Sequence, residues 1–392
     1  MEYNFDRAIE REGTNCFKYD IRKELFGRED VLPMWVADMD IEVPDFIIDA
    51  LQERLSHKIF GYSFRPEGFM QAITDWNKRR NNWSIKNEWI SFSPGVVPAL
   101  NLLVMGLTGP GDKVLVQTPV YFPFFTAVTN HKRTLVRNSL ILENGNYVMD
   151  YEDLEKKFKD GVKMFFLCSP HNPVGRVWKK DELEKVAELA LKYNVLVIAD
   201  EIHSDIIMPG NKHIPFASLG EDVAKNTITC MAPSKTFNLA GLSTSYLVIS
   251  DEKLRKIYEK TLDVVHVGHG NIFGDISCQA AYEKGGAWVD AFVKYIHGNI
   301  EWMEKELKKQ LPKLKFIQPE GTYLVWLDFR EYGLKHSELK DLIINKGKLG
   351  FSDGPTFGKE GVGFQRINVG CPLSTVQEAT NRLKIALDFA KK

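Results

Sequence analysis

Short apolar runs alternate with stretches of helical periodicity between residues 90 and 250, and this alternation constrains the fold more than any other feature. The predicted strands are residues 90–93, 113–117, 135–137, 164–168, 195–199, 227–231 and 245–250. The predicted helices are residues 96–107, 122–130, 151–159 and 181–193. Strands joined by helical crossovers pair in parallel, so we predict an α/β fold with a mostly parallel sheet covered by helices on both faces.

The two ends of the chain follow another pattern. Amphipathic helices are predicted at 44–60 and 66–82, before the alternating region. After it come a long helix at 288–311, strands at 323–329 and 364–369, and a C-terminal helix from Ser374. We therefore predict a large domain of residues 45–285 and a smaller α+β domain formed by residues 1–44 and 286–392.

Composition excludes several classes of protein. Lys and Arg number 51 against 52 Asp and Glu, so a net charge of −1 supplies no field that would attract nucleic acid or an anionic membrane. The five cysteines are scattered and form no C-x-x-C pair, which argues against disulfides and thiolate metal sites. With neither a signal-like start nor a run of about 18 apolar residues, the chain is expected to be cytoplasmic.

Several catalytic signatures are absent. The sequence has no G-x-G-x-x-G after a strand, no P-loop, no H-E-x-x-H and no G-x-S-x-G. The close histidine pair, His266 and His269, has glycines around it and no nearby carboxylate or cysteine, so we predict a loop or interface role for it. No metal site is expected.

Polar residues follow the central strands where those strands end. Asp200 closes the apolar run VLVIA, Asn172 follows MFFLC between two prolines, and Lys235 follows the next strand. Open α/β sheets bind ligands outside the carboxyl ends of their strands. A carboxylate there needs a cationic partner or hydrogen-bond donors, and a partly desolvated lysine is an imine-forming nucleophile.

Residues further upstream complete this set. Gly95 precedes a helix start, so the free N–H groups of Val96 and Val97 and the helix dipole favour a phosphate. Tyr121 opens the next loop and can stack on a flat ring. Taken singly, each residue has an ordinary structural explanation, such as a solvated lysine, a capping carboxylate, a core tyrosine or a turn. Together they supply the parts that hold pyridoxal phosphate.

Three segments carry a resemblance to a known family. SPHNPVGRVW, VIADEIHSD and PSKTFNLAGL resemble the cofactor segments of fold-type I pyridoxal-phosphate enzymes, the aspartate-aminotransferase-like superfamily. The resemblance implies a large domain with a mostly parallel, seven-stranded sheet and a smaller α+β domain. It places Asn172, Asp200 and Lys235 in the amide, pyridinium-partner and covalent-lysine positions. It also implies a homodimer with shared active sites.

Other segments resemble one branch, the MalY/PatB-type C–S β-lyases. These are LPMWVADMDIEVP at residues 32–44, His203, and GFQRINVGCP at residues 363–372. By this resemblance His203 donates to the phenolic oxygen of the cofactor. Arg366 matches the arginine that binds the substrate α-carboxylate, for which a guanidinium fork is well shaped.

The chain departs from many relatives at two phosphate-binding positions. Ala232 and Ser243 stand where a serine and an arginine are common. The phosphate is therefore expected to rely on Ser234, on the helix start and on Tyr62 of a partner chain, with further donors unidentified. Tyr62, Trp35 and Tyr323 are also candidates to line the substrate pocket.

The resemblance implies β-elimination from an S-substituted cysteine such as cystathionine, which releases pyruvate, ammonia and a thiol. In this hypothesis Lys235 removes the Cα proton and Asp200 keeps the pyridine nitrogen protonated. The same residues also suit an aminotransferase, so this alternative stays open. A non-catalytic regulatory protein on the same fold is the third alternative. It is disfavoured because the key polar residues are intact and no appended DNA-binding domain is visible.

Overall fold

The computed structural model describes residues 3–389, and its largest element is a seven-stranded sheet. The strands lie in the order β2 (Ile90–Ser93), β10 (Ser245–Ile249), β9 (Thr227–Met231), β8 (Leu196–Asp200), β7 (Val162–Cys168), β3 (Lys113–Thr118) and β4 (Thr134–Ser139). Only β10 runs antiparallel to its neighbours, while the other pairs are parallel. The predicted mostly parallel, seven-stranded sheet is confirmed.

Helices cover both faces of this sheet. One face is covered by α5 (Val96–Leu107), α6 (Pro123–Thr129) and α10 (Glu252–Val264), and the other by α7 (Tyr151–Lys159) and α8 (Lys180–Lys192). The central strands therefore bury alternate residues in two separate apolar clusters, with Phe165 in one and Phe166 in the other. This explains why their sequences are apolar without interruption. The short helix α9 (Glu221–Lys225) precedes β9.

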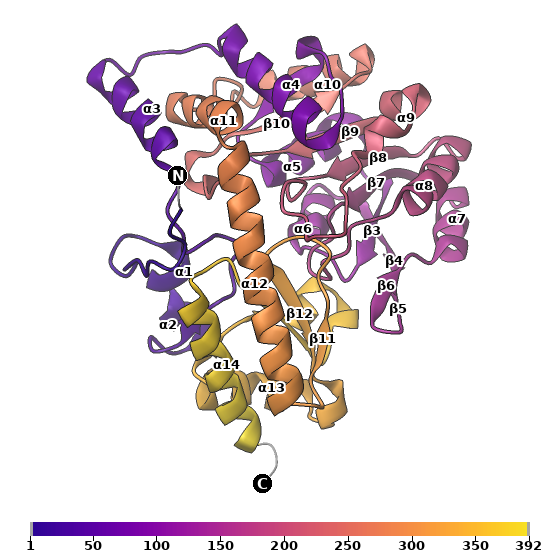
Figure 1. Ribbon diagram of the computed structural model, residues 1–392. Coiled ribbons are helices and arrows are strands. Elements are labelled where there is room, and N and C mark those ends of the chain that lie inside the picture. Colours follow the sequence, from indigo (N-terminus) through magenta and orange to yellow (C-terminus); the bar gives the residue numbers. More distant parts are fainter. Residues whose placement is uncertain (1–2, 390–392) are drawn as a thin grey trace.

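A smaller, antiparallel sheet forms the other half of the molecule. Its strands are β11 (Lys315–Ile317), β12 (Leu324–Asp328), β15 (Phe364–Asn368) and β14 (Ser352–Asp353), and its helices are α12 (Gly286–Gln310), α13 (His336–Asp341) and α14 (Leu373–Asp388). Figure 1 shows α12 running from the half with the large sheet into this smaller half, where it packs on α14. One apolar cluster extends from Trp76 to Leu324 and joins the two halves.

The N-terminal segment packs against the C-terminal one. It contains α1 (Phe17–Asp20), α2 (Arg22–Phe26) and β1 (Leu32–Pro33), and β1 pairs in parallel with β13 (Leu349–Gly350). The next two helices, α3 (Asp45–Ser56) and α4 (Glu67–Asn81), pack against α11 (Ile272–Lys284) beside the large sheet. The chain thus passes from the smaller half to the larger one between β1 and α3.

Several elements differ from the sequence predictions. The helix predicted at 44–60 ends at Ser56, because the Arg54 guanidinium donates to the carbonyls of His57 and Ile59 and closes the last turn. The helices α10 and α11 were not predicted, nor was the hairpin of β5 (Ile141–Glu143) and β6 (Asn146–Val148), whose turn places Asn144 and Gly145 at positive φ. Within residues 3–389, no helix combines the length and apolar character needed to cross a membrane.

Candidate active site

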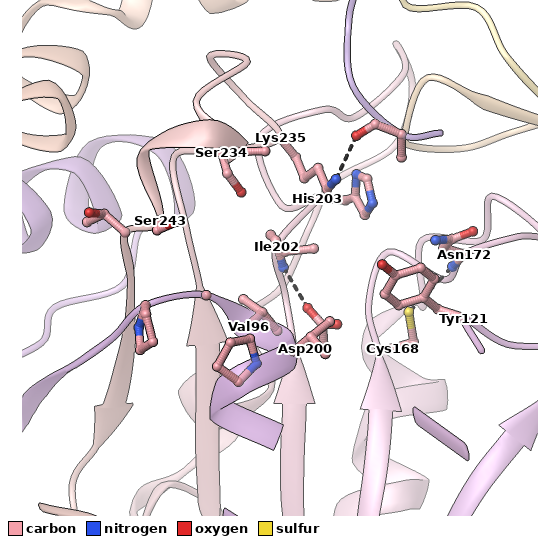
Figure 2. A pocket seen from close by; sticks show the side chains of 17 residues that line it. Val96, Tyr121, Cys168, Asn172, Asp200, Ile202, His203, Ser234, Lys235 and Ser243 are labelled. Atoms are coloured by element: carbon pink, nitrogen blue, oxygen red, sulfur yellow. Dashed lines mark hydrogen bonds between the residues drawn. The ribbon is translucent and has the colours of Figure 1, made fainter. Parts of the chain in front are cut away.

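A cavity of about 210 Å³ opens at the carboxyl ends of β7 and β8, next to the start of α5. This is the edge of the sheet at which ligands of open α/β folds bind. Figure 2 shows side chains from several elements converging on it. Its lining consists of Ala37, Pro94, Gly95, Val96, Val97, Pro98, Tyr121, Cys168, Asn172, Asp200, Ile202, His203, Ser234, Lys235, Ala240, Ser243 and Thr244.

Asp200 is the last residue of β8 and only 5% of it is exposed. Its carboxylate accepts one hydrogen bond, from the Ile202 N–H at 3.2 Å, and no lysine or arginine of residues 3–389 forms an ion pair with it. Burial raises the pKa of Asp200 to about 7, although the Ile202 N–H and the Lys235 charge oppose the shift. The carboxyl group therefore favours a ligand that brings a positive charge or a proton donor.

Lys235 lies in a turn that follows β9. The turn is held by the hydroxyl of Thr236, which donates to Asp205, and by Asn238, which bonds to the backbone of Met39 and Ile41. The Lys235 amine donates to the carbonyl oxygen of Ala37 at 2.6 Å. Burial lowers the pKa of Lys235 to about 8, so roughly a tenth of the amine is neutral at pH 7. This amine is a competent nucleophile and proton acceptor.

His203 and Asn172 lie on the side of the cavity away from α5. His203 is 3% exposed, its Nδ1 has no partner among the described residues, and burial keeps its pKa well below the usual value, so the ring is neutral. The Asn172 side-chain oxygen accepts from Arg366 Nη1 at 2.8 Å, and its backbone oxygen accepts from the Tyr121 N–H at 3.1 Å. Figure 2 shows the Tyr121 ring beside Asn172.

Hydroxyl and N–H donors gather at the opposite end of the cavity. The first two N–H groups of α5, those of Val96 and Val97, have no intrahelical acceptor, and the helix dipole adds positive potential there. Ser234 and Ser243 lie on the same side of the cavity as the start of α5 (Figure 2). This end is suited to an anion such as a phosphate.

Arg366 lies on β15 and is 4% exposed. Besides its bond to Asn172, its Nη2 donates to the Trp35 carbonyl at 2.6 Å and to the Ser352 hydroxyl at 3.0 Å. Its Nε is buried without a partner among the described residues. Burial lowers the pKa of Arg366 to about 10, so the guanidinium stays charged at neutral pH and can bind a carboxylate.

Four predicted site residues do not line this cavity: Arg366, Trp35, Tyr323 and Tyr62. The Trp35 ring lines a neighbouring cavity of about 240 Å³, and only its carbonyl reaches Arg366. Tyr323 is fully buried and donates its hydroxyl to the Ala37 carbonyl at 3.1 Å. Tyr62 is 99% exposed, with its ring next to that of His269, so it does not enter the cavity of its own chain.

Sequence reasoning missed some residues that line the cavity. Thr244 is one of them, whereas Ser243 was identified through the resemblance, as the residue at a phosphate-binding position. Both precede β10, and their place at the site follows from the direction of this strand. Because β10 is antiparallel to β9, its first residues lie at the edge where the parallel strands end. The Ala37 carbonyl was also missed, because a main-chain acceptor leaves no signal in the residue type. Cys168, at the end of β7 beside Asp200, was predicted only as part of a strand.

The cavity fits pyridoxal phosphate. A buried carboxyl without an ion pair, a neutral histidine with an unpartnered nitrogen, and a nucleophilic amine correspond to the ring nitrogen, ring oxygen and aldehyde of that cofactor. The donors at the α5 end correspond to its phosphate. Among residues 3–389, no group of three or more His, Cys, Asp and Glu side chains is arranged to hold a metal ion.

The chain matches known proteins along nearly its whole length. The family model of aminotransferases of class I and II matches residues 29–383. Cystathionine beta-lyase PatB of Bacillus subtilis (strain 168) is 46% identical over 385 residues, covering 98% of this chain and 100% of PatB. Protein MalY of Escherichia coli (strain K12) is 32% identical over 380 residues, covering 96% of each chain. The crystal structure of cystalysin from Treponema denticola, which contains pyridoxal 5'-phosphate, has a TM-score of 0.97 at 38% identity and covers 99% of this chain and 100% of that one.

Proposed function

The chain belongs to the family of class I and II aminotransferases, within its MalY/PatB-type branch, and from this premise we propose that it is a pyridoxal-phosphate-dependent C–S β-lyase. The enzyme cleaves S-substituted L-cysteines such as cystathionine and, with one water, releases pyruvate, ammonia and a thiol. The full-length match to cystathionine beta-lyase PatB is the observation that supports this type of reaction. The cavity at the ends of β7 and β8 supports the choice of cofactor.

The residues that would hold the cofactor follow from the lining of the cavity. Lys235 would bind it covalently, Asp200 would face its ring nitrogen, and Tyr121 would contact its ring. His203 and Asn172 would donate to its ring oxygen. Its phosphate would lie at Gly95, Val96, Val97 and Ser234, with Ser243 as an added donor and Tyr62 supplied by a second chain. When bound, the cofactor supplies an electron sink for the charge that develops at the substrate Cα.

The chain's own groups would bind the substrate and move its proton. The guanidinium of Arg366, unpartnered at Nε, would bind the substrate carboxylate. The Lys235 amine, with a pKa of about 8, would remove the Cα proton, since general bases work best with a pKa near the operating pH. Protonated Lys235 would then be the nearest proton source for the departing sulfur. Asp200 would hold the ring nitrogen protonated.

An exposed apolar cluster supports the proposed homodimer with shared active sites. Ile59, Phe60, Tyr62 and Phe64 are 68%, 56%, 99% and 86% exposed, within a single non-helical segment. Such a concentration of exposed aromatic side chains is typical of an interface. Sedimentation of the purified enzyme at micromolar concentration should give the mass of two chains. A single-chain mass that persists with full activity would exclude shared sites.

Two further assignments rest on this proposal. The division into residues 45–285 and residues 1–44 with 286–392 is supported by the two separate sheets, although one apolar cluster spans both parts. A cytoplasmic location is supported by the five cysteines, all buried and none in a disulfide.

One assay separates the candidate reactions. We expect purified enzyme supplied with L-cystathionine, and no 2-oxo acid, to release pyruvate and a free thiol continuously. Turnover only after a 2-oxo acid is added would identify an aminotransferase instead. A protein that binds the cofactor and turns over neither substrate set would be a regulatory protein on the same fold.

A further inference from the structure

Residues 35–40, with the sequence WVADMD, form neither a helix nor a strand, and we call this segment the strap. None of its side chains has a part in the proposed reaction. The main-chain carbonyls of its first five residues, however, all accept hydrogen bonds from side chains, and successive carbonyls accept from alternate sets of partners. The carbonyls of Trp35, Ala37 and Met39 accept from one set of partners, whereas those of Val36 and Asp38 accept from another. The strap is therefore hydrogen-bonded through its main chain to two different sets of side chains.

The first set of carbonyls contacts the two cations of the proposed reaction. The Trp35 carbonyl accepts from Arg366 at 2.6 Å, and the Ala37 carbonyl accepts from Lys235 at 2.6 Å. The two carbonyls belong to residues two apart in the sequence, and the chain bends at Val36 and Ala37. Two peptide units of the strap therefore connect the carbonyl that accepts from the Lys235 amine to the carbonyl that accepts from the Arg366 guanidinium. The Met39 carbonyl accepts from Asn238, three residues after Lys235, at 2.9 Å.

The second set of carbonyls contacts one side chain. The amide nitrogen of Asn368 donates to the Val36 carbonyl at 2.7 Å and to the Asp38 carbonyl at 2.5 Å. Its side-chain oxygen accepts from the Gly370 N–H at 2.8 Å, which fixes the orientation of the amide. Asn368 is 1% exposed and lies on β15, two residues after Arg366. It therefore bridges the strap on the side opposite Lys235.

Charged side chains hold the C-terminal end of the strap. Asp40 accepts from Lys18 at 2.6 Å and from Arg11 at 2.6 Å, and Arg11 also bonds to Asp38 at 2.8 Å. Lys18 is 1% exposed, so this is a buried pair whose disruption leaves a charge without a partner. The charges of the two cations, Lys18 and Arg11, neutralise those of the two carboxylates, Asp38 and Asp40. The strap is thus held by the ion pairs of its own Asp38 and Asp40 side chains and by the hydrogen bonds of Asn368 to its carbonyls.

We propose that the strap is a positioning element that sets the distance between the proton-accepting amine of Lys235 and the carboxylate-binding guanidinium of Arg366, and that Asn368 is the positioning residue that holds it. This inference rests on the proposed C–S lyase reaction. Substrate bound by its carboxylate at Arg366 must present its Cα hydrogen to Lys235, and a displacement of about 1 Å can reduce a rate 100-fold. Asn368 acts through the strap and contacts neither cation.

The test compares two buried asparagines with the same bonding pattern. Asn299 is also 1% exposed, and its amide nitrogen also bridges two carbonyls in alternate positions, those of Val369 and Cys371. It does not contact the strap. In the holoenzyme with L-cystathionine, Asn368→Ala should lower kcat/KM 10- to 100-fold, with kcat decreased and KM increased. Asn299→Ala should stay within threefold of wild type in both constants, although the two variants lose similar thermal stability.

Two further variants test the two ends of the strap separately. Ser352 bonds to both Arg366 and the Trp35 carbonyl, so Ser352→Ala should raise KM three- to tenfold and leave kcat within twofold. Tyr323 donates only to the Ala37 carbonyl, so Tyr323→Phe should lower kcat three- to tenfold and leave KM within twofold. The separate effects on KM and kcat are measured without an Asn368 variant, so they test the inference even if Asn368→Ala does not fold.

A second readout does not depend on turnover. Burial lowers the pKa of Lys235 and the Asp38 carboxylate of the strap opposes this shift, so loosening the strap should lower the pKa of this amine further. In cofactor-free full-length protein, the pH midpoint for acetylation of Lys235, followed by mass spectrometry, should shift down by about half a pH unit or more in Asn368→Ala. The shift should be absent in Asn299→Ala.

Equal kinetic constants and equal acetylation midpoints in the two asparagine variants would overturn the inference. So would a Ser352→Ala variant that changes kcat and a Tyr323→Phe variant that changes KM. Failure of the proposed function is distinguishable, because wild-type enzyme would then release no pyruvate from L-cystathionine without a 2-oxo acid. The acetylation shift would still report whether Asn368 holds the strap against Lys235.

Discussion

The two walls of the cavity are built from different chemical groups. The wall formed by the large sheet presents side chains, among them Asp200 at the end of β8 and Asn172 after β7. A second wall is formed by the strap, which contributes Ala37 to the lining and binds Lys235 through the main-chain carbonyl of this residue. In the first wall the residue type is the functional group. In the second wall the functional group is the main chain, and the site requires a particular conformation of the chain, which the Asp38 and Asp40 side chains help to hold.

This difference locates the sensitive positions. A substitution at Asp200 removes a functional group directly, whereas a substitution at Ala37 or Val36 leaves the carbonyl in place. The strap depends instead on residues that hold it from a distance, such as Asn368 and Lys18. Substitutions in the large-sheet wall should therefore lower activity by removing a functional group. Substitutions around the strap should lower activity by displacing its carbonyls.

The largest effect is expected for Lys235→Ala. Removing the amine should lower kcat about 10⁴-fold, equivalent to about 5.5 kcal/mol of transition-state stabilisation, because both the proton acceptor and the covalent attachment are lost. The visible absorption band of the bound cofactor should also disappear. Steady-state kinetics and an absorption spectrum measure both effects. Lys225→Ala, on the exposed helix α9, is the control and should match wild type.

An unchanged absorption band in Lys235→Ala would show that another amine binds the cofactor. A loss of activity with the band intact would leave Lys235 as a proton acceptor only. The first result would move the covalent attachment away from the large-sheet wall, whereas the second would leave this wall with proton transfer alone.

The next effect is a pH dependence of stability caused by Asp200. Its pKa is about 7 in the folded, cofactor-free protein against 3.8 unfolded, so between about pH 4 and pH 7 the folded protein binds the extra proton. The free energy of unfolding should therefore fall as pH rises through this window, by up to about 4 kcal/mol from this group. Asp200→Asn should remove that part of the slope. Urea unfolding at several pH values measures it.

The expected signature is a difference between two curves. Cofactor-free wild type and Asp200→Asn should be similar near pH 4, and the variant should be the more stable of the two above pH 7. The exposed Asp222→Asn on α9 serves as a control and should leave the curve of wild type unchanged. Parallel curves for wild type and Asp200→Asn would mean that the carboxyl ionises without cost in the fold.

The large-sheet wall could be predicted from sequence because its signals are local. An apolar run followed by a polar residue identifies a strand end, and parallel strands bring such ends to one edge, which is how Asp200, Asn172 and Lys235 were placed. Ser243 and Thr244 could not be found in this way, because they begin a strand whose antiparallel direction is not visible in its sequence.

The strap wall could not be predicted, for a different reason. The resemblance selected residues 32–44 and named Trp35 as a lining side chain. The structure shows that the carbonyl of Trp35 contacts Arg366, while its ring lines the neighbouring cavity. A carbonyl is common to every residue type, so its function depends on pairings between distant segments, such as Asn368 with Val36. No local pattern encodes those pairings.

A third substitution tests the wall formed by the strap. Lys18→Met removes one partner of a buried pair and should lower the free energy of unfolding by about 3 kcal/mol, because Asp40 loses one of its two cations but keeps Arg11. Since Asp40 lies at the end of the strap, kcat/KM should also fall about tenfold. Urea unfolding and steady-state kinetics measure the two effects.

Two controls accompany this prediction. Lys23→Met breaks a surface pair with Glu29 and should cost less than about 1 kcal/mol. Val36→Ala changes a strap side chain without moving its carbonyl and should keep kcat/KM within about threefold. If Val36→Ala were as damaging as Lys18→Met, the side chains of the strap would carry function and the contrast between the walls would be lost.

The smallest effect is expected at the phosphate end, where Ser243 replaces an arginine that many relatives have. Ser243→Ala should weaken pyridoxal phosphate binding about fivefold, or about 1 kcal/mol, because one hydroxyl among several donors is lost. It should leave KM for cystathionine unchanged, because Arg366 contacts Asn172, on the side of the cavity away from Ser243. Absorbance titration of cofactor-free protein measures the affinity, with Ser218→Ala, outside the cavity, as control. A change in KM with unchanged cofactor affinity would place Ser243 among the substrate contacts, and the large-sheet wall would then bind both ends of the reacting complex.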